Sequence, residues 1–176
     1  VAVSSATAGL HLSYLALGLK RFKKILTSPI TFVSTANAAY FCNAKVKFID
    51  VDGSNLIMDP KKVEKELKLD SSIEIVVPIL FGGASEGIDK IAKIAKNYEK
   101  YIVEDAAHGL GGSYISGEKI GSCVYSDCTV FSLHPVKSIA AGEGGVITTN
   151  NEDIYKKLLR LRSHGINKLD DKFQYK

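Results

Sequence analysis

Short apolar or β-branched stretches recur along the chain, separated by turns that contain Gly, Pro, Ser or Asp. Runs of this length and composition are typical of strands buried in a sheet. The pattern predicts strands at residues 1–3, 30–35, 45–52, 73–80, 101–107, 128–133 and 145–149. A glycine-bounded stretch also predicts a small hairpin at residues 112–122.

Helical patterns lie between most of these strands. Apolar residues at helical spacing follow the capping residues 4–7 and predict a largely buried helix, with Ala8, Leu12, Leu15 and Leu19 on its apolar face. Further patterns predict helices at residues 36–41, at Pro60–Leu69, from Ile88 onward and around residues 154–161. Because strands and helices alternate, the sequence predicts an α/β fold, a mostly parallel sheet covered by helices on both faces.

Composition narrows the class of protein. The chain has 176 residues and a formal net charge of +4, and its lysines are spread over predicted helices, which argues against a nucleic-acid surface. No apolar run approaches the roughly 20 residues of a membrane-spanning helix. Cys42, Cys123 and Cys128 form no CxxC pair, a pattern that fits a reducing cytosol and predicts neither a disulfide framework nor a metal site.

The two ends of the chain indicate a longer protein. The first residue is Val1, already inside an apolar strand, and the last residues follow a polar helix without a terminating pattern. We therefore expect residues 1–176 to form one domain that lacks an N-terminal segment and a C-terminal portion.

Candidate chemistry concentrates where predicted strands end, which is where α/β sheets bind ligands. The stretch SSATAG, residues 4–9, leads from a strand into a helix whose free N–H groups suit an anion such as phosphate, although taken alone it is more simply explained as a plain N-cap. Glu104 and Asp105 end another strand, where a carboxylate holds a positively charged nitrogen or caps a helix. Phe32, near a third strand end, either stacks on a flat ring or packs in the core.

Lys137 has the most distinctive setting. It follows the strand run that contains Ser132, and the glycines Gly142, Gly144 and Gly145 come shortly after it. A lysine in a partly desolvated pocket can form a Schiff base with an aldehyde, and glycines let the backbone approach a ligand closely, although most loop lysines are simply solvated. Together, an anion cradle, an aromatic ring, a carboxylate and an amine match the phosphate, ring, pyridine nitrogen and aldehyde of pyridoxal 5'-phosphate.

The same stretches resemble the DegT/DnrJ/EryC1/StrS family of sugar-nucleotide aminotransferases. FSLHPVKSIAAGEGGVITTN is similar to the lysine segment of the family, VEDAAHGLGG to its acidic segment and SSATAGLHLSYLALGL to its phosphate segment. The resemblance implies fold type I, the aspartate-aminotransferase-like fold, with residues 1–176 as the large domain that binds pyridoxal phosphate, without the C-terminal small domain. Ala6 stands where the family often has Gly, and Leu133 replaces a frequent aromatic residue; neither removes a reacting group.

The resemblance also implies a role for each site residue. Lys137 is expected to form the Schiff base with pyridoxal 5'-phosphate and then to move protons, and Asp105 is expected to pair with the pyridine nitrogen. The other expected cofactor-binding residues are Ala6, Thr7 and Ser132 at the phosphate, Phe32 on the ring face and His108 near the phenolic oxygen.

The substrate is implied by a narrower similarity. HPVKSI, GEGGVITTN and LRSHGINK are most similar to the pseudaminic-acid branch of the family. This implies amino transfer, with glutamate as donor, to C4 of a UDP-linked 4-keto-6-deoxy-N-acetylhexosamine by a cytoplasmic homodimer with a shared active site.

Other functions stay open. They include a perosamine-like or other keto-sugar aminotransferase and a non-catalytic regulator on the same fold. A dehydratase of the family has histidine in place of Lys137, and a Rossmann domain should show GxGxxG after the first strand, which SSATAG does not.

Overall fold

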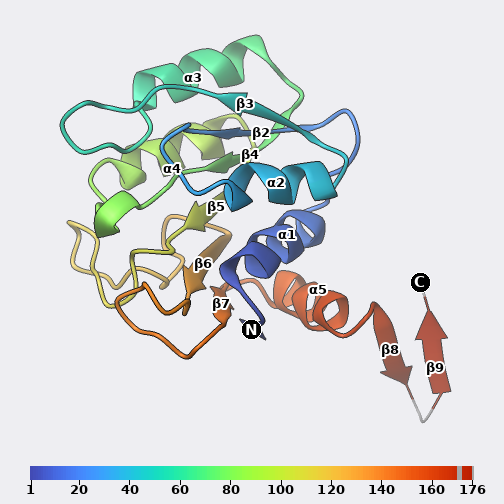
Figure 1. Ribbon diagram of the computed structural model, residues 1–176. Helices are drawn as coiled ribbons and strands as arrows, with labels where there is room; N and C mark the ends of the chain where they lie inside the picture. Colours follow the sequence, from blue (N-terminus) through green and yellow to red (C-terminus); the bar gives the residue numbers. More distant parts are fainter. Residues whose placement is uncertain (170–171, 176) are drawn as a thin grey trace.

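A seven-stranded sheet forms the centre of the structure (Figure 1). The computed structural model describes residues 1–169 and 172–175, with residues 167–169 and 172–175 described by their backbone alone. The strands lie in the order β1 (Ala2–Val3), β7 (Gly145–Thr148), β6 (Cys128–Ser132), β5 (Tyr101–Asp105), β4 (Ile73–Val77), β2 (Lys24–Thr27) and β3 (Lys45–Phe48). Within this sheet β7 runs opposite to the other six strands, so the predicted, mostly parallel α/β fold is confirmed.

Helices cover both faces of this sheet (Figure 1). One apolar cluster joins the sheet to α1 (Ala6–Ala16), α2 (Ser34–Phe41) and α5 (Glu152–Arg162). A second cluster joins the opposite face to α3 (Pro60–Leu69) and α4 (Ile88–Asn97). A short 3₁₀ turn, η1 (Phe81–Gly83), follows β4, and β8 (Ile166–Leu169) pairs with β9 (Lys172–Tyr175) in a separate two-stranded sheet.

The helix over residues 60–69 has the predicted bounds, and the other predicted helices are confirmed with small shifts. The predicted strand at residues 30–35 is wrong. The strand is Lys24–Thr27, residues 28–33 form a loop, and Ser34 begins α2. Pro29 has no N–H to donate to a neighbouring strand. Just after the predicted strand, the small residues Ala36, Ala38 and Ala39 are buried, so packing extends α2 back to Ser34 despite the β propensity of residues 30–35.

Two smaller expectations are also corrected. The predicted hairpin at 112–122 is reduced to one antiparallel bridge between Ser113 and Lys119. In α1 the fully buried residues include Leu10 and Tyr14, whereas Leu12 is only partly buried. The helix packs on the sheet and against both α2 and α5, so its burial does not follow a single stripe.

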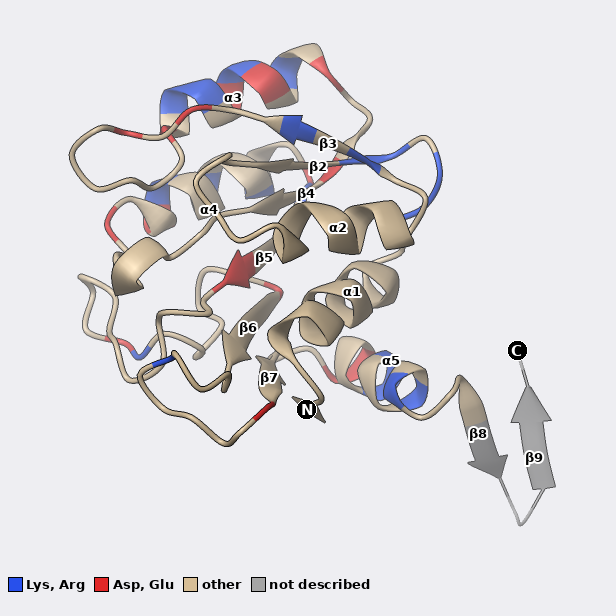
Figure 2. Cartoon of the chain, in the orientation of Figure 1, with Lys and Arg blue, Asp and Glu red and all other residues tan. Residues whose placement is uncertain are grey.

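Charge is distributed unevenly over the helices (Figure 2). Lysine, arginine, aspartate and glutamate are concentrated on α3, α4 and α5, whereas α1 and α2 carry none. The three cysteines are free and buried. Every helix in the described part of the chain is too short or too polar to cross a bilayer, and no group of three metal-ligating side chains occurs there.

Strand register brings distant segments to one edge of the sheet. Val3 pairs with Gly145, and Gly145 pairs in turn with Ser132, so three strands align these positions. The turn from β1 into α1 therefore lies beside the carboxyl end of β6. The carboxyl ends of β4 and β5 reach the same edge because these strands are parallel to β6.

Candidate active site

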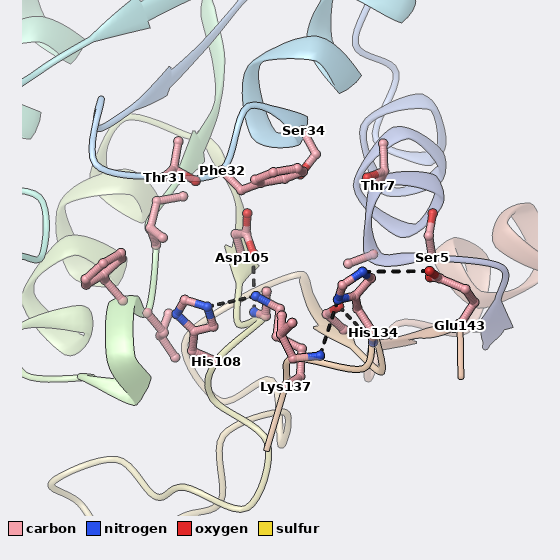
Figure 3. A pocket seen from close by; sticks show the side chains of 18 residues that line it. Ser5, Thr7, Thr31, Phe32, Ser34, Asp105, His108, His134, Lys137 and Glu143 are labelled. Carbon is pink, nitrogen blue, oxygen red and sulfur yellow. Dashed lines mark hydrogen bonds and ion pairs between the residues drawn. The ribbon is translucent and has the colours of Figure 1, made fainter. Parts of the chain in front are cut away.

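One cavity of about 290 Å³ lies at this edge and is lined by every site residue predicted from the sequence (Figure 3). These residues are Ala6, Thr7, Phe32, Asp105, His108, Ser132 and Lys137. They come from the start of α1, the loop before α2, the end of β5 with the turn after it, and the end of β6 with the segment that follows. Lining residues that the sequence analysis did not single out include Thr31, Phe81, His134 and Glu143.

The start of α1 forms one end of the cavity. Ser5 is the N-cap residue, and its hydroxyl accepts a hydrogen bond from Ala8 N–H at 3.1 Å. The N–H groups of Ala6 and Thr7, in the first turn, have no acceptor within the helix, and they carry the positive end of the helix dipole. Ser132 Oγ accepts from His134 N–H at 3.3 Å, which leaves its own proton free to donate. This set of donors fits a phosphate group.

Gly145 makes this arrangement possible. A Cβ at this position would lie 2.6 Å from the carbonyl carbon of Ser5 and 2.7 Å from the nitrogen of Ala6. Only glycine lets β7 approach the turn so closely. Of the three glycines noted near Lys137, Gly145 thus packs against the chain itself, and Gly144 lines the cavity.

Replacing Gly145 by alanine should displace the start of α1. We expect the full-length protein to lose about 1–3 kcal/mol of stability through overpacking, and its affinity for pyridoxal 5'-phosphate to fall at least about tenfold. Thermal unfolding and cofactor titration measure the two effects. Gly53→Ala is the matched control, because nothing lies within 4 Å of a Cβ there. An unchanged cofactor affinity in Gly145→Ala would show that the cradle does not depend on this close approach.

Asp105 is a buried carboxylate beneath Phe32 in Figure 3. Its Oδ2 accepts from the Thr35 hydroxyl at 2.6 Å, and its Oδ1 accepts from Ala107 N–H at 3.3 Å. Burial raises the pKa of Asp105, and the hydrogen bond from Thr35 acts in the opposite direction. Among the residues that the structure describes, none forms an ion pair with Asp105. A buried carboxylate without a cation at a cavity wall fits a positively charged nitrogen of a ligand.

Lys137 and His108 meet on the opposite wall. Lys137 Nζ lies 2.8 Å from His108 Nε2. Figure 3 draws this contact as a dashed line. In the neutral ring Nδ1 accepts from Gly82 N–H at 3.2 Å, which leaves Nε2 as the ring nitrogen that faces Lys137 and the cavity. Burial, and next the charge of Lys137, lower the pKa of His108 and favour this neutral form. The ring of Phe81 supports His108 from the side, with ring centroids 5.7 Å apart.

Phe32 supplies an aromatic face. It lies in the loop before α2, not at a strand end as predicted, and its side chain is 73% exposed although it lines the cavity. Figure 3 shows its ring on the α2 side, above Asp105, with Lys137 further below. A ring placed between Phe32 and Lys137 would meet an aromatic face on one side and the amine on the other.

Strand alternation separates the two adjacent acids, Glu104 and Asp105. Glu104 points away from the cavity, where its Oε2 accepts hydrogen bonds of 2.7 Å from Tyr114 and from Thr129. Sequence reasoning also missed Thr35, a fully buried residue behind the cavity wall that donates a hydrogen bond to Asp105. It fell inside the stretch expected to be a strand, and no local sequence pattern links it to Asp105, which is 70 positions away.

Comparison with known proteins shows the family of the chain. The whole chain, residues 1–176, matches the DegT/DnrJ/EryC1/StrS aminotransferase family. The chain belongs to this family. Two relatives in the family are UDP-4-amino-4,6-dideoxy-N-acetyl-beta-L-altrosamine transaminases of Campylobacter jejuni strains, at 46% identity over 165 residues and 42% over 164 residues. Each alignment covers 93% of this chain and 43% of the relative, so the chain spans less than half the length of the curated relatives.

Solved structures of aminotransferases share the fold. Helicobacter pylori PseC, an aminotransferase involved in the biosynthesis of pseudoaminic acid, superimposes with a TM-score of 0.90 at 27% identity, over 100% of this chain and 47% of that one. NtdA of Bacillus subtilis, whose structure contains bound cofactor PMP, gives a TM-score of 0.87 at 25% identity, over 99% and 40%. These matches confirm the fold type I assignment. The chain covers only part of the length of each of these structures.

Proposed function

We propose that the protein transfers an amino group from glutamate to the C4 keto group of a UDP-linked 4-keto-6-deoxy-N-acetylhexosamine, with pyridoxal 5'-phosphate as cofactor. The observation that carries this proposal is the meeting of Lys137, Asp105 and the start of α1 at one cavity. Family membership and the two transaminase relatives support the reaction, and the relatives' printed names support the sugar.

The residues present fit the cofactor. Ala6, Thr7 and Ser132 would hold the phosphate, Phe32 would cover the ring, and Asp105 would hold the ring nitrogen. When bound, pyridoxal 5'-phosphate supplies an aldehyde for amines and a ring that withdraws electrons from the carbon beside the reacting nitrogen.

The chain's own groups account for binding and proton transfer. Lys137 Nζ is the amine that would bond to the aldehyde of the cofactor. As a free amine it would move a proton between the α-carbon of the amino donor and C4' of the cofactor. Asp105 stabilises positive charge at the ring nitrogen because an anion in a buried site interacts strongly with a nearby cation. His108 can donate from Nε2 to an oxygen beside Lys137, since Gly82 holds the other ring nitrogen.

Assembly and location belong to the same proposal. We propose a homodimer with a shared active site in the cytoplasm. The uncharged outer surface of α1 and α2, with exposed Tyr40 and Phe41, supports a protein contact on that side. The free cysteines are compatible with a reducing compartment.

A two-stage assay tests the proposed function. Glutamate is first added to the full-length protein loaded with pyridoxal 5'-phosphate, and we expect conversion of the cofactor to pyridoxamine phosphate with release of 2-oxoglutarate. The UDP-linked 4-keto sugar is then added and should regain the starting absorbance while forming an amino sugar. A failure of the first stage would leave a binding protein on this fold; a failure of the second alone would point to another keto sugar.

A further inference from the structure

Two threonine hydroxyls form a chain that runs from the partly buried Thr31, at the cavity wall, through the buried Thr35 to Asp105. Thr35 Oγ1 donates to Asp105 Oδ2 at 2.6 Å, and Thr31 Oγ1 lies 2.7 Å from Thr35 Oγ1. A carboxylate can only accept, so the single hydroxyl proton of Thr35 points to Asp105, and Thr31 must donate to Thr35. Hydroxyls that donate in series polarise each other and strengthen the bond to the terminal acceptor.

We propose that Thr35 is a positioning residue that holds the Asp105 carboxylate, in its ionised form, in the orientation needed for the ring nitrogen of the cofactor. This inference rests on the proposed function, because it assumes that Asp105 serves pyridoxal 5'-phosphate. Thr35 reaches no cofactor atom itself under this proposal and acts through Asp105.

The surroundings of Asp105 make such help necessary. Burial favours the neutral acid and raises its pKa, while the Thr35 hydroxyl, the Ala107 N–H, the charge of Lys137 and, when its ring is protonated, that of His108 favour the carboxylate. The other titratable group facing Asp105 is Tyr14 of α1, which is fully buried and neutral, its own pKa raised by burial and then by Asp105. Thr35 is the side chain within hydrogen-bond distance that donates to the carboxylate.

The position of Thr35 is itself well fixed. It is completely buried in the first turn of α2, and its carbonyl accepts from the Tyr14 hydroxyl at 3.3 Å. Phe32 precedes the same turn, so one short segment presents the aromatic face and orients the carboxylate below it, as Figure 3 shows for Phe32 and Asp105. A displacement of this turn would disturb both contacts with the cofactor together.

The test compares the full-length wild type with Thr35→Val, Thr35→Ser and Thr27→Val. The dissociation constant of pyridoxal 5'-phosphate is measured between about pH 5.5 and pH 8.5, together with the rate of the glutamate half-reaction. Valine keeps the shape but removes the donor, so the pKa of Asp105 should rise and the neutral acid should persist to higher pH. We expect Thr35→Val to bind the cofactor about tenfold more weakly at the acid end, with a smaller loss at the alkaline end, and to react at least about tenfold more slowly.

The controls separate orientation from stability. Thr35→Ser retains the hydroxyl and should stay within about twofold of the wild type. Thr27→Val removes an equally buried hydroxyl that donates to Val77 C=O at 2.8 Å, away from the cavity, so it should lower the unfolding temperature without a pH-dependent loss of affinity.

The outcomes distinguish this inference from the proposed function. A Thr35→Val protein that differs from the wild type no more than Thr27→Val does, or a Thr35→Ser protein that is as impaired as Thr35→Val, would overturn the role of the hydroxyl. Wild type that binds the cofactor but gives no pyridoxamine phosphate with glutamate would overturn the proposed reaction alone. Wild type that does not bind the cofactor would overturn both.

Discussion

Lys137→Ala in the full-length protein should abolish amino transfer and the visible absorbance band of lysine-bound pyridoxal 5'-phosphate. The variant loses the amine that lies at the cavity wall, 2.8 Å from His108, and no other lysine lines that cavity among the described residues. General acid–base catalysis alone accounts for about a hundred- to ten-thousandfold in rate, and loss of the covalent link adds to this. We therefore expect turnover to fall at least about a thousandfold.

Lys65→Ala provides a matched control for this experiment. Lys65 is exposed on α3, on the face of the sheet away from α1, so its removal should leave both absorbance and turnover unchanged. Amino transfer that persists in Lys137→Ala, in single-turnover experiments with glutamate, would refute the assignment of the amine.

Asp105→Asn should retain the cofactor but lose most of the rate. The amide keeps the shape and can still accept from Thr35, yet it offers no negative charge to a protonated ring nitrogen. Breaking a buried charge pair costs about 3–5 kcal/mol, which corresponds to a loss of at least about a hundredfold in the rate of the glutamate half-reaction. The measurement is a stopped-flow absorbance trace of the loaded protein mixed with glutamate.

The adjacent acid is the control for Asp105→Asn. Glu104→Gln replaces a carboxyl group of similar burial that faces Tyr114 and Thr129 on the other side of β5. Its half-reaction should remain within about threefold of the wild type, because the substitution leaves the cavity untouched. Near-normal rates in Asp105→Asn would mean that another group supports the ring nitrogen.

Local patterns predicted most of the fold correctly for identifiable reasons. Pro60 and Asp59 fix the start of α3, because proline suits the first helical position and the Asp59 side chain caps the turn by accepting from Lys61 N–H at 2.9 Å. The run at 73–77 forms a central strand because all of its residues except Glu74 are apolar and buried. The prediction of a strand at 30–35 was wrong because this segment forms a loop and the start of α2. Its residues Thr31 and Thr35 make side-chain hydrogen bonds there instead of pairing in the sheet.

The site was predictable where the chemistry of a residue is unusual for its setting. Lys137 and Asp105 stood out because ionisable side chains at the ends of buried strands are candidates for a functional site. Thr35 and Phe81 did not stand out, because a buried threonine or phenylalanine is ordinary and only their distance to Asp105 or His108 gives them meaning.

The sequence by itself determined the alternating α/β order, the family and the residues that carry reactive groups, because propensity, caps and side-chain chemistry are local properties. Only the tertiary structure decided which groups face one another. The register of β1, β7 and β6 places the start of α1 beside Ser132, and the alternation of β5 turns Asp105 inward and Glu104 outward. The hydroxyl chain to Asp105 likewise depends on packing α2 against α1 and the sheet, since contacts between residues 70 positions apart arise only when the core forms.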